Sequence, residues 1–151
     1  MTTYTVVDGT KEHSLRLRHI LRPLDKREIC GQGGHVRKIM WRTFNQSIFT
    51  RTALVDGEVV AMWGLGGTIL SDEGHPWLLT APAVERLPMA IVREARGAIW
   101  DMLELRSYLW NYVLADYTGA IRLLEVIGFA IDPPTSPWAT GEKYRKFWLR
   151  R

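Results

Sequence analysis

A long amphipathic helix is predicted between two apolar strands, and this arrangement limits the fold more than any other feature of the chain. Residues Pro76–Thr80 and Tyr108–Val113 are rich in apolar and aromatic side chains, which is typical of buried strands. Between them, Pro88 suits the first turn of a helix that extends to about Leu105. The apolar stripe of this helix consists of Val92, Ala95, Ile99 and Met102. A right-handed crossover then makes the two strands parallel.

The other predicted elements place further strands and helices around this unit. Asp56-Gly57 is a strong hairpin signal, and Gly128 lies where a left-handed cap would end a helix capped at Thr118. The predicted strands are Tyr4–Val7, Ile48–Val55, Glu58–Gly64, Phe129–Ile131 and Tyr144–Leu149, and further helices are predicted before Pro23 and over Asp25–Cys30 and Val36–Phe44. The order β-α-α-β-β-β-α-β-α-β predicts an α/β fold with a central mixed sheet and helices on both faces.

The length of 151 residues and the apolar content of 46% suit a single domain over residues 1–151. The apolar runs are too short for a membrane-spanning helix and the N-terminus lacks a secretory pattern, so a cytoplasmic location is expected. Cys30, the single cysteine, excludes an internal disulfide and is expected to be buried or half-buried. The four histidines lack metal-ligand spacing, so no metal is expected.

The formal net charge of +4 allows attraction to anions, from a nucleotide cofactor to nucleic acid, without choosing between them. Basic residues gather in His13–Arg27, and in Lys143–Arg151 they alternate with aromatic residues. An edge strand protected by Lys and Arg explains the second segment. Nucleic-acid binding would need a continuous basic stripe on the surface and is therefore the less favoured interpretation.

The order of elements and several short motifs resemble the GNAT superfamily of N-acetyltransferases over nearly the full chain. As in that superfamily, the helix after the fifth strand ends in Gly-Phe, here Gly128-Phe129. More narrowly, four segments are similar to a group of phage and prophage GNAT-like proteins that includes an internal virion protein of short-tailed phages. These segments are Pro76–Thr80, Val84–Arg86, Trp110–Val113 and Ile121–Leu124.

The resemblance implies that acetyl-coenzyme A lies in a V between two splayed parallel strands, Pro76–Thr80 and Tyr108–Val113. A backbone N–H near Leu79 or Thr80 would polarise the acetyl carbonyl. The pyrophosphate would lie at the start of the following helix, where N–H groups and the helix dipole attract anions. The residues implied at that end are Arg86, Pro88, Met89, Ala90 and Arg93.

The resemblance also implies where the acceptor amine arrives. It would lie beside Trp77, with Asp25 and Glu28 near the substrate entrance. The two acids lie about one helical turn apart, beside Arg22 and Arg27, so an ion-pair network also explains them.

Two candidate catalytic residues complete the predicted site. Glu85 is placed to deprotonate an amine, although an acid at this point also simply suits the start of a helix. Leu124 falls where the superfamily has its general-acid tyrosine, and leucine cannot protonate a thiolate. Tyr117 would have to replace that acid, or is a buried packing residue. Pro88 falls where the phosphate-binding loop of the superfamily has a small residue, and proline donates no backbone N–H.

Three functions follow from these observations. The leading one is a phage or prophage GNAT-like N-acetyltransferase that transfers acetyl to an unidentified amine by direct attack. The second is a non-catalytic structural or interaction protein that keeps the fold for virion assembly or host contact, with the virion as its location. The third, nucleic-acid binding, rests on charge alone.

Overall fold

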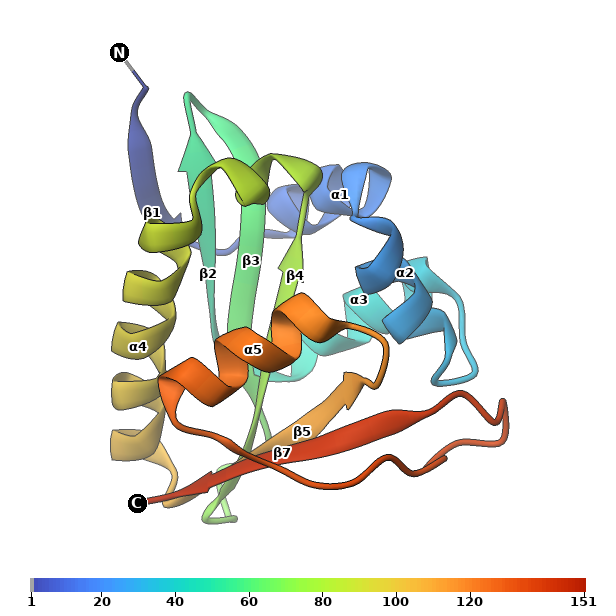
Figure 1. The fold of residues 1–151 in the computed structure, drawn as a ribbon. Helices are drawn as coiled ribbons and strands as arrows, with labels where there is room; N and C mark the ends of the chain where they lie inside the picture. The colour runs from blue at the N-terminus through green and yellow to red at the C-terminus, as the bar shows by residue number, and fades with distance from the viewer. Residues whose placement is uncertain (1) are drawn as a thin grey trace.

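The computed structural model describes residues 2–151, which form a seven-stranded mixed sheet flanked by helices (Figure 1). The strand order is β1-β2-β3-β4-β5-β7-β6. The strands are β1 (Tyr4–Asp8), β2 (Ser47–Val55), β3 (Glu58–Gly66), β4 (Glu73–Thr80), β5 (Tyr108–Leu114), β6 (Ala130–Ile131) and β7 (Tyr144–Arg150). The helices are α1 (Lys11–Ile20), α2 (Pro23–Cys30), α3 (Val36–Gln46), α4 (Pro88–Leu105) and α5 (Thr118–Ile127), with a 3-10 helix η1 (Pro82–Arg86) before α4. This is the predicted α/β architecture.

Two backbone predictions are confirmed by positive φ angles. Asp56 (φ 49) and Gly57 (φ 81) form the tight turn between β2 and β3, and both lie in the left-handed region that this type of hairpin turn requires. Gly128 (φ 118) ends α5 in the left-handed conformation, and its N–H donates to the carbonyls of Leu124 and Glu125.

Several local predictions are wrong. The predicted element order counted two helices before β2, whereas the three helical segments predicted there all form separate helices, α1, α2 and α3. Thr118 is the first residue of α5 and not its cap; Tyr117 occupies the cap position, because its carbonyl accepts the hydrogen bond from the N–H of Ile121. Cys30 is exposed, because it is the last residue of α2 and the chain turns away at Gly31.

The core is divided between the two faces of the sheet. On one face, α4 and α5 contribute Met102 and Ile121 to a large apolar cluster. On the other face, Leu17, Ile29 and Met40 from the three N-terminal helices form a smaller cluster. The central strand β3 supplies residues to both clusters, so it fixes the helices of both layers relative to one another.

The strands β4 and β5 are parallel and then separate, as predicted. They pair at Glu73 with Tyr108 and at Gly74 with Leu109, and every other neighbouring pair of strands in the sheet is antiparallel. Past this short ladder, the Nδ2 atom of Asn111 donates to the carbonyl of Pro76 at 2.9 Å. The helix α4 makes the crossover between the two strands (Figure 1).

Gly64 on β3 provides a test of the packing beside this opening. A Cβ at Gly64 would lie 2.6 Å from the Phe49 carbonyl and 2.7 Å from the Trp77 ring. We therefore expect Gly64→Ala to lower the free energy of unfolding by about 1–3 kcal/mol, measured by urea denaturation. Gly66→Ala, in the same strand, is the control, because its nearest neighbour would lie at an ordinary 3.5 Å. Equal effects of the two substitutions would contradict this account of the packing.

Candidate active site

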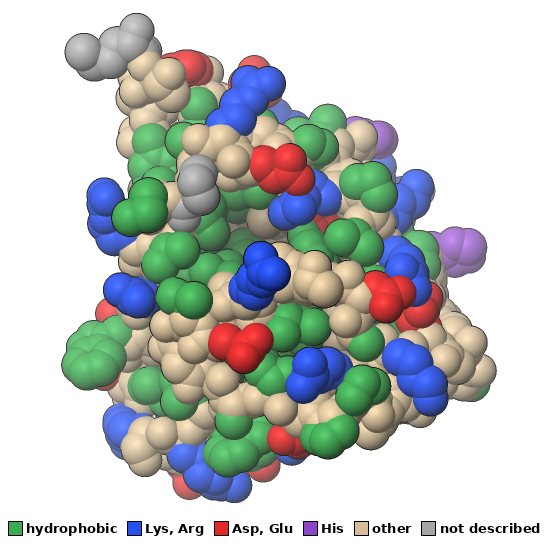
Figure 2. Space-filling view, viewed as in Figure 1, with side chains coloured by type: hydrophobic (Ala, Val, Ile, Leu, Met, Phe, Trp, Pro, Cys, Tyr) green, Lys and Arg blue, Asp and Glu red, His purple; other side chains and the backbone are tan. Residues whose placement is uncertain are grey.

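A cavity of about 700 Å³ lies where β4 and β5 separate. Ile29 and Thr43 line it from α2 and α3, whereas Ala95 and Leu124 line it from α4 and α5. The cavity therefore has walls on both faces of the sheet. Figure 2 shows hydrophobic side chains gathered in the hollow between α4, η1 and α5. A volume of this size is typical of sites that enclose a small-molecule ligand.

Asp25 is buried at this opening, with 2% of its surface exposed. Its Oδ2 atom accepts hydrogen bonds from the backbone N–H of Thr80, at 2.9 Å, and from the Thr80 hydroxyl. Burial raises the pKa of Asp25, against the lowering effect of these two bonds. The N–H of Thr80 is thus already paired with a carboxylate of the protein.

The direction of the β4 backbone identifies another N–H at the opening. The N–H of Ala81 donates to Val60 on β3 at 2.9 Å, and Leu79 is the register partner of Met62 on the same strand. Because hydrogen bonds alternate along an antiparallel pair, the N–H of Leu79 also faces β3. The N–H of Leu78 faces the opposite side, toward β5. Leu78, which the sequence analysis did not single out, is the better-placed donor for a ligand in the cavity.

Glu28 lies one turn after Asp25 and reaches the other strand. Its Oε2 atom accepts a hydrogen bond from the N–H of Leu114, at the end of β5, at 2.9 Å. Burial raises the pKa of Glu28 to about 8; the nearby Asp25 carboxylate acts in the same direction, and the Leu114 bond opposes it. The two acids of α2 therefore bind the ends of both separated strands.

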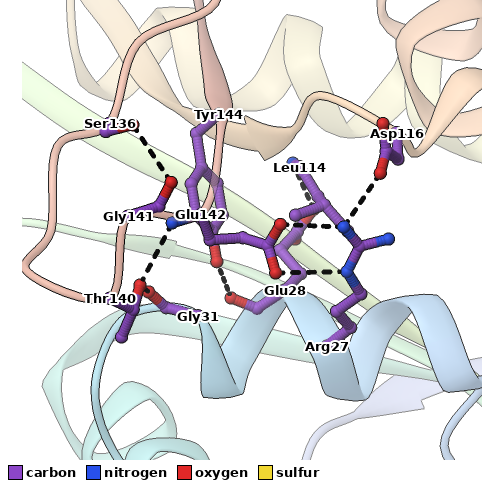
Figure 3. A network of polar contacts seen from close by, with 10 residues as sticks. All are labelled: Arg27, Glu28, Gly31, Leu114, Asp116, Ser136, Thr140, Gly141, Glu142 and Tyr144. Carbon is purple, nitrogen blue, oxygen red and sulfur yellow. Dashed lines mark hydrogen bonds and ion pairs between the residues drawn. The ribbon is translucent and has the colours of Figure 1, made fainter.

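The predicted ion-pair network of Asp25 and Glu28 with Arg22 and Arg27 is not formed. Arg27 instead pairs with Asp116 and Glu142, each at 2.8 Å, as Figure 3 shows. Asp25 and Glu28 accept hydrogen bonds from backbone N–H groups. The arginines pair with acids on other elements.

The helix α2 is fixed by a network on its far side (Figure 3). The Tyr144 hydroxyl of β7 donates to the carbonyl of Glu28 at 2.6 Å, and the Thr140 hydroxyl donates to that of Gly31. A Cβ at Gly31 would overlap the Tyr144 hydroxyl, which explains the glycine at this position. These contacts tie the helix that bears both acids to the C-terminal strand.

Both candidate catalytic residues line the cavity. Glu85 is exposed and pairs with Arg22 at 2.9 Å. Tyr117 is buried, and its ring lies 5.4 Å from the Arg22 guanidinium carbon. Burial and the nearby Asp25 carboxylate raise the pKa of Tyr117, so this hydroxyl keeps its proton at neutral pH. Tyr117 is thus a packing residue of the cavity wall that retains its hydroxyl proton.

Trp77 also lines the cavity and is held in a fixed orientation. Its ring packs across Gly64, and its Nε1 donates to the Ser47 hydroxyl at 2.8 Å. Trp63 is a second tryptophan of the lining. The third tryptophan of the neighbouring strands, Trp110, instead contacts the His75 ring edge to face at 4.5 Å.

The residues predicted to bind phosphates surround the start of α4. Arg86 is the last residue of η1 and is exposed, and Met89 and Ala90 lie in the first turn of α4. Arg93 is exposed. Burial raises the pKa of Tyr4 on β1, and the charge of Arg93 opposes that rise.

A cation missed by the sequence analysis lines the cavity instead of Arg93. Val92 and Ala95 line it, whereas Arg93 is not part of the lining formed by the residues with described side chains. Arg86, Met89 and Ala90 are not part of that lining either. Arg122 of α5 is part of that lining. It belongs to the recognised Ile121–Leu124 motif, but the sequence does not say which way its helix is rotated.

The described chain, residues 2–151, contains no group of three His, Cys, Asp or Glu side chains arranged to hold a metal ion. Within the same residues, none of the helices has the length and apolar character needed to span a membrane.

The architecture matches solved structures of acetyltransferases. A protein assigned as an acetyltransferase from Acinetobacter baylyi superposes with a TM-score of 0.74 at 13% identity, over 100% of this chain and 94% of that one. A GNAT-family acetyltransferase from Streptococcus pneumoniae gives 0.68 at 11% identity, over 98% and 99%. RimL, a ribosomal-protein acetyltransferase in complex with coenzyme A, gives 0.70 at 5% identity, over 98% and 94%.

These likenesses show that the chain has the GNAT fold. No protein-family model and no curated protein matches its sequence.

The raised pKa of Glu28 predicts how stability depends on pH. Between its ordinary pKa of 4.5 and about 8, Glu28 keeps its proton in the folded chain but loses it on unfolding. The folded state then binds more protons, so the free energy of unfolding falls as pH rises through this window. Asp25, whose pKa is also raised, contributes in the same sense.

We expect Glu28→Gln to be more stable than the parent above pH 8, with a smaller decline between pH 5 and 8, measured by urea denaturation. The amide oxygen still accepts the Leu114 bond but never carries a charge. Glu125→Gln, at an exposed position on α5, is the control and should leave the profile unchanged. A parent and a Glu28→Gln variant with parallel pH profiles would contradict the assignment of the buried proton.

Proposed function

We propose that this protein is an N-acetyltransferase that uses acetyl-coenzyme A as its acetyl donor and an amine as acceptor. The observation that carries the proposal is the cavity between β4 and β5, which has walls on both faces of the sheet of a GNAT fold. Such a cavity allows a donor to occupy one face and an acceptor the other.

The residues present suit acetyl-coenzyme A, which supplies an acetyl thioester when bound. The apolar walls from α4 and α5 suit its pantetheine arm, and the N–H of Leu78 faces the gap where the thioester carbonyl would lie. The N–H groups of Met89 and Ala90 at the start of α4 suit the phosphates. Arg122 would add charge to this end, because it lines the cavity, whereas Arg86 and Arg93 lie outside the lining that the described residues form.

The opposite side of the cavity suits a cationic amine. Asp25, Glu28 and Glu85 all line it, and Trp77 supplies an aromatic wall. Glu28 is the best general base of the three, because Asp25 already accepts two bonds from Thr80 and Glu85 is paired with Arg22. A carboxylate with a pKa of about 8 holds a proton more firmly than an exposed glutamate does.

In the proposed reaction a C–N bond forms between the amine and the acetyl carbon while the C–S bond breaks. Glu28 accepts the proton that the amine loses. Tyr117, which keeps its proton at neutral pH, donates to the departing thiolate in place of the missing tyrosine at Leu124. Glu85 then orients Arg22 rather than acting as the base.

A second candidate is a non-catalytic GNAT-fold protein of phage origin that acts in virion assembly or host contact. The similarity of its motifs to phage and prophage GNAT-like proteins supports this origin. Pro88, which donates no N–H, and Leu124, in place of a tyrosine, support the loss of catalysis. A role in the host cytoplasm or in the virion accords with either candidate.

Binding of acetyl-coenzyme A separates the two candidates. At about a hundredfold above its dissociation constant, the ligand adds about 2.7 kcal/mol of stability, which for a domain of this size raises the Tm by about 5–10 °C. We expect this shift in the parent and a smaller one in Arg122→Gln, measured by differential scanning fluorimetry. Arg96→Gln, at an exposed position on α4, is the control. No shift at millimolar ligand would favour the scaffold.

The pH dependence of the acetylation rate tests the role of Glu28. Because a general base must be deprotonated, kcat/KM for an amine should rise with pH and level off above about 8. Glu28→Gln should lower kcat/KM by about a hundredfold or more and remove this step, while its Tm shift with acetyl-coenzyme A stays unchanged. An unaltered pH profile in Glu28→Gln would assign the base elsewhere.

A further inference from the structure

A second cavity, of about 780 Å³, lies as a groove between α1 and α3. Four cations line it, Lys11 and Arg18 from α1 and Arg37 and Lys38 from α3. Among the residues that the structure describes along this groove there is no aspartate or glutamate. Both walls therefore present positive charge to whatever lies between them.

These two helices carry a large share of the positive charge of the chain. They contain six Lys and Arg residues and a single acid, Glu12, whose carboxylate pairs with Arg16 at 2.8 Å. Their formal charge is +5, whereas that of the chain is +4, so the remaining residues together are slightly acidic. The basic character therefore lies in the groove and in the C-terminal segment Lys143–Arg151, which has five Lys and Arg residues and no acid, while the rest of the chain is acidic on balance.

An exposed aromatic ring lines the groove together with these basic residues. Trp41 of α3 lines the groove with 63% of its surface exposed. Arg37 and Lys38 lie one turn before it on the same side of the helix, and Phe44 lies one turn after it. Leu15 and Met40 complete an apolar floor.

We propose that this groove binds single-stranded nucleic acid. The bases stack on Trp41, and the phosphates contact the lysines and arginines of the two walls. A combination of aromatic rings with a basic groove is the usual design of sequence-tolerant single-strand sites, because every base offers a flat ring and every nucleotide a phosphate. An acidic peptide would match the charge but would bring no flat ring to the indole. This function does not depend on acetyl transfer, since the catalytic cavity lies on the other side of α3.

The probe is a fluorescein-labelled oligothymidylate of about 20 nucleotides, followed by fluorescence anisotropy over a range of salt concentrations. We expect the parent to bind it with an affinity that falls as salt rises, with a slope of about 0.7 for each phosphate contacted. Combining Trp41→Ala with Arg37→Gln should weaken binding about tenfold or more and flatten the slope. Trp41→Phe should retain most of the affinity, because phenylalanine still stacks.

The chain offers a matched control on α4. Trp100 is 72% exposed, and Arg96 precedes it by the same four residues that separate Arg37 from Trp41. Three acids, Glu94, Asp101 and Glu104, lie in the same helix, which therefore lacks a net positive charge. Trp100→Ala with Arg96→Gln should bind the probe as the parent does.

Three results would overturn the proposal. The first is no binding at low salt by a parent that melts cooperatively. The second is an equal loss in the α4 control, which would indicate attraction by total charge. The third is equal binding of a DNA duplex or of polyglutamate in competition, which would show that neither the bases nor their accessibility matters. Circular dichroism of each variant verifies that the loss of binding is not a loss of folding.

Discussion

The N–H groups at the ends of β4 and β5 are the constraint on which the site depends. Where two parallel strands separate, the N–H groups that faced the neighbouring strand lose their partners, and buried donors without partners are costly. Asp25 takes the N–H of Thr80, and Glu28 takes that of Leu114. One turn of α2 thus supplies acceptors in place of the neighbouring strand. The sheet can remain open between β4 and β5 without an unpaired N–H at Thr80 or at Leu114.

This solution determines the chemistry of the opening. Two carboxylates are placed in partly enclosed surroundings, where the charged form is disfavoured and the pKa rises. The arrangement requires α2 to be held firmly, because a shift of the helix would leave both acids and both N–H groups unpaired. The bonds of Tyr144 to Glu28 and of Arg27 to Glu142 hold the helix from the side of β7. The side chains that keep the sheet open are therefore also the two acids whose pKa is raised in the cavity.

The sequence predicts the periodic parts of this molecule and misses the contacts between distant segments. The apolar stripe of α4 and the Asp56-Gly57 hairpin depend only on residues that are close in the chain, so the local sequence is sufficient to predict them. The partners of Asp25 and Glu28 lie 55 and 86 residues away, and spacing alone suggested nearby arginines instead. The side that each N–H of β4 faces also depends on a distant segment, because the register with β3 turns the N–H of Leu79 toward β3 and that of Leu78 toward β5.

The helix α3 lies between the cavity and the basic groove and lines both of them. Its Thr43 lines the cavity, together with four acids and with Arg22 and Arg122, while its Trp41 lines the basic groove. Met40 lines both spaces and packs in the core between them, so the two surfaces are divided by a layer of apolar side chains. The net charge of the chain, +4, does not reveal how the charged residues are distributed between the cavity and the groove.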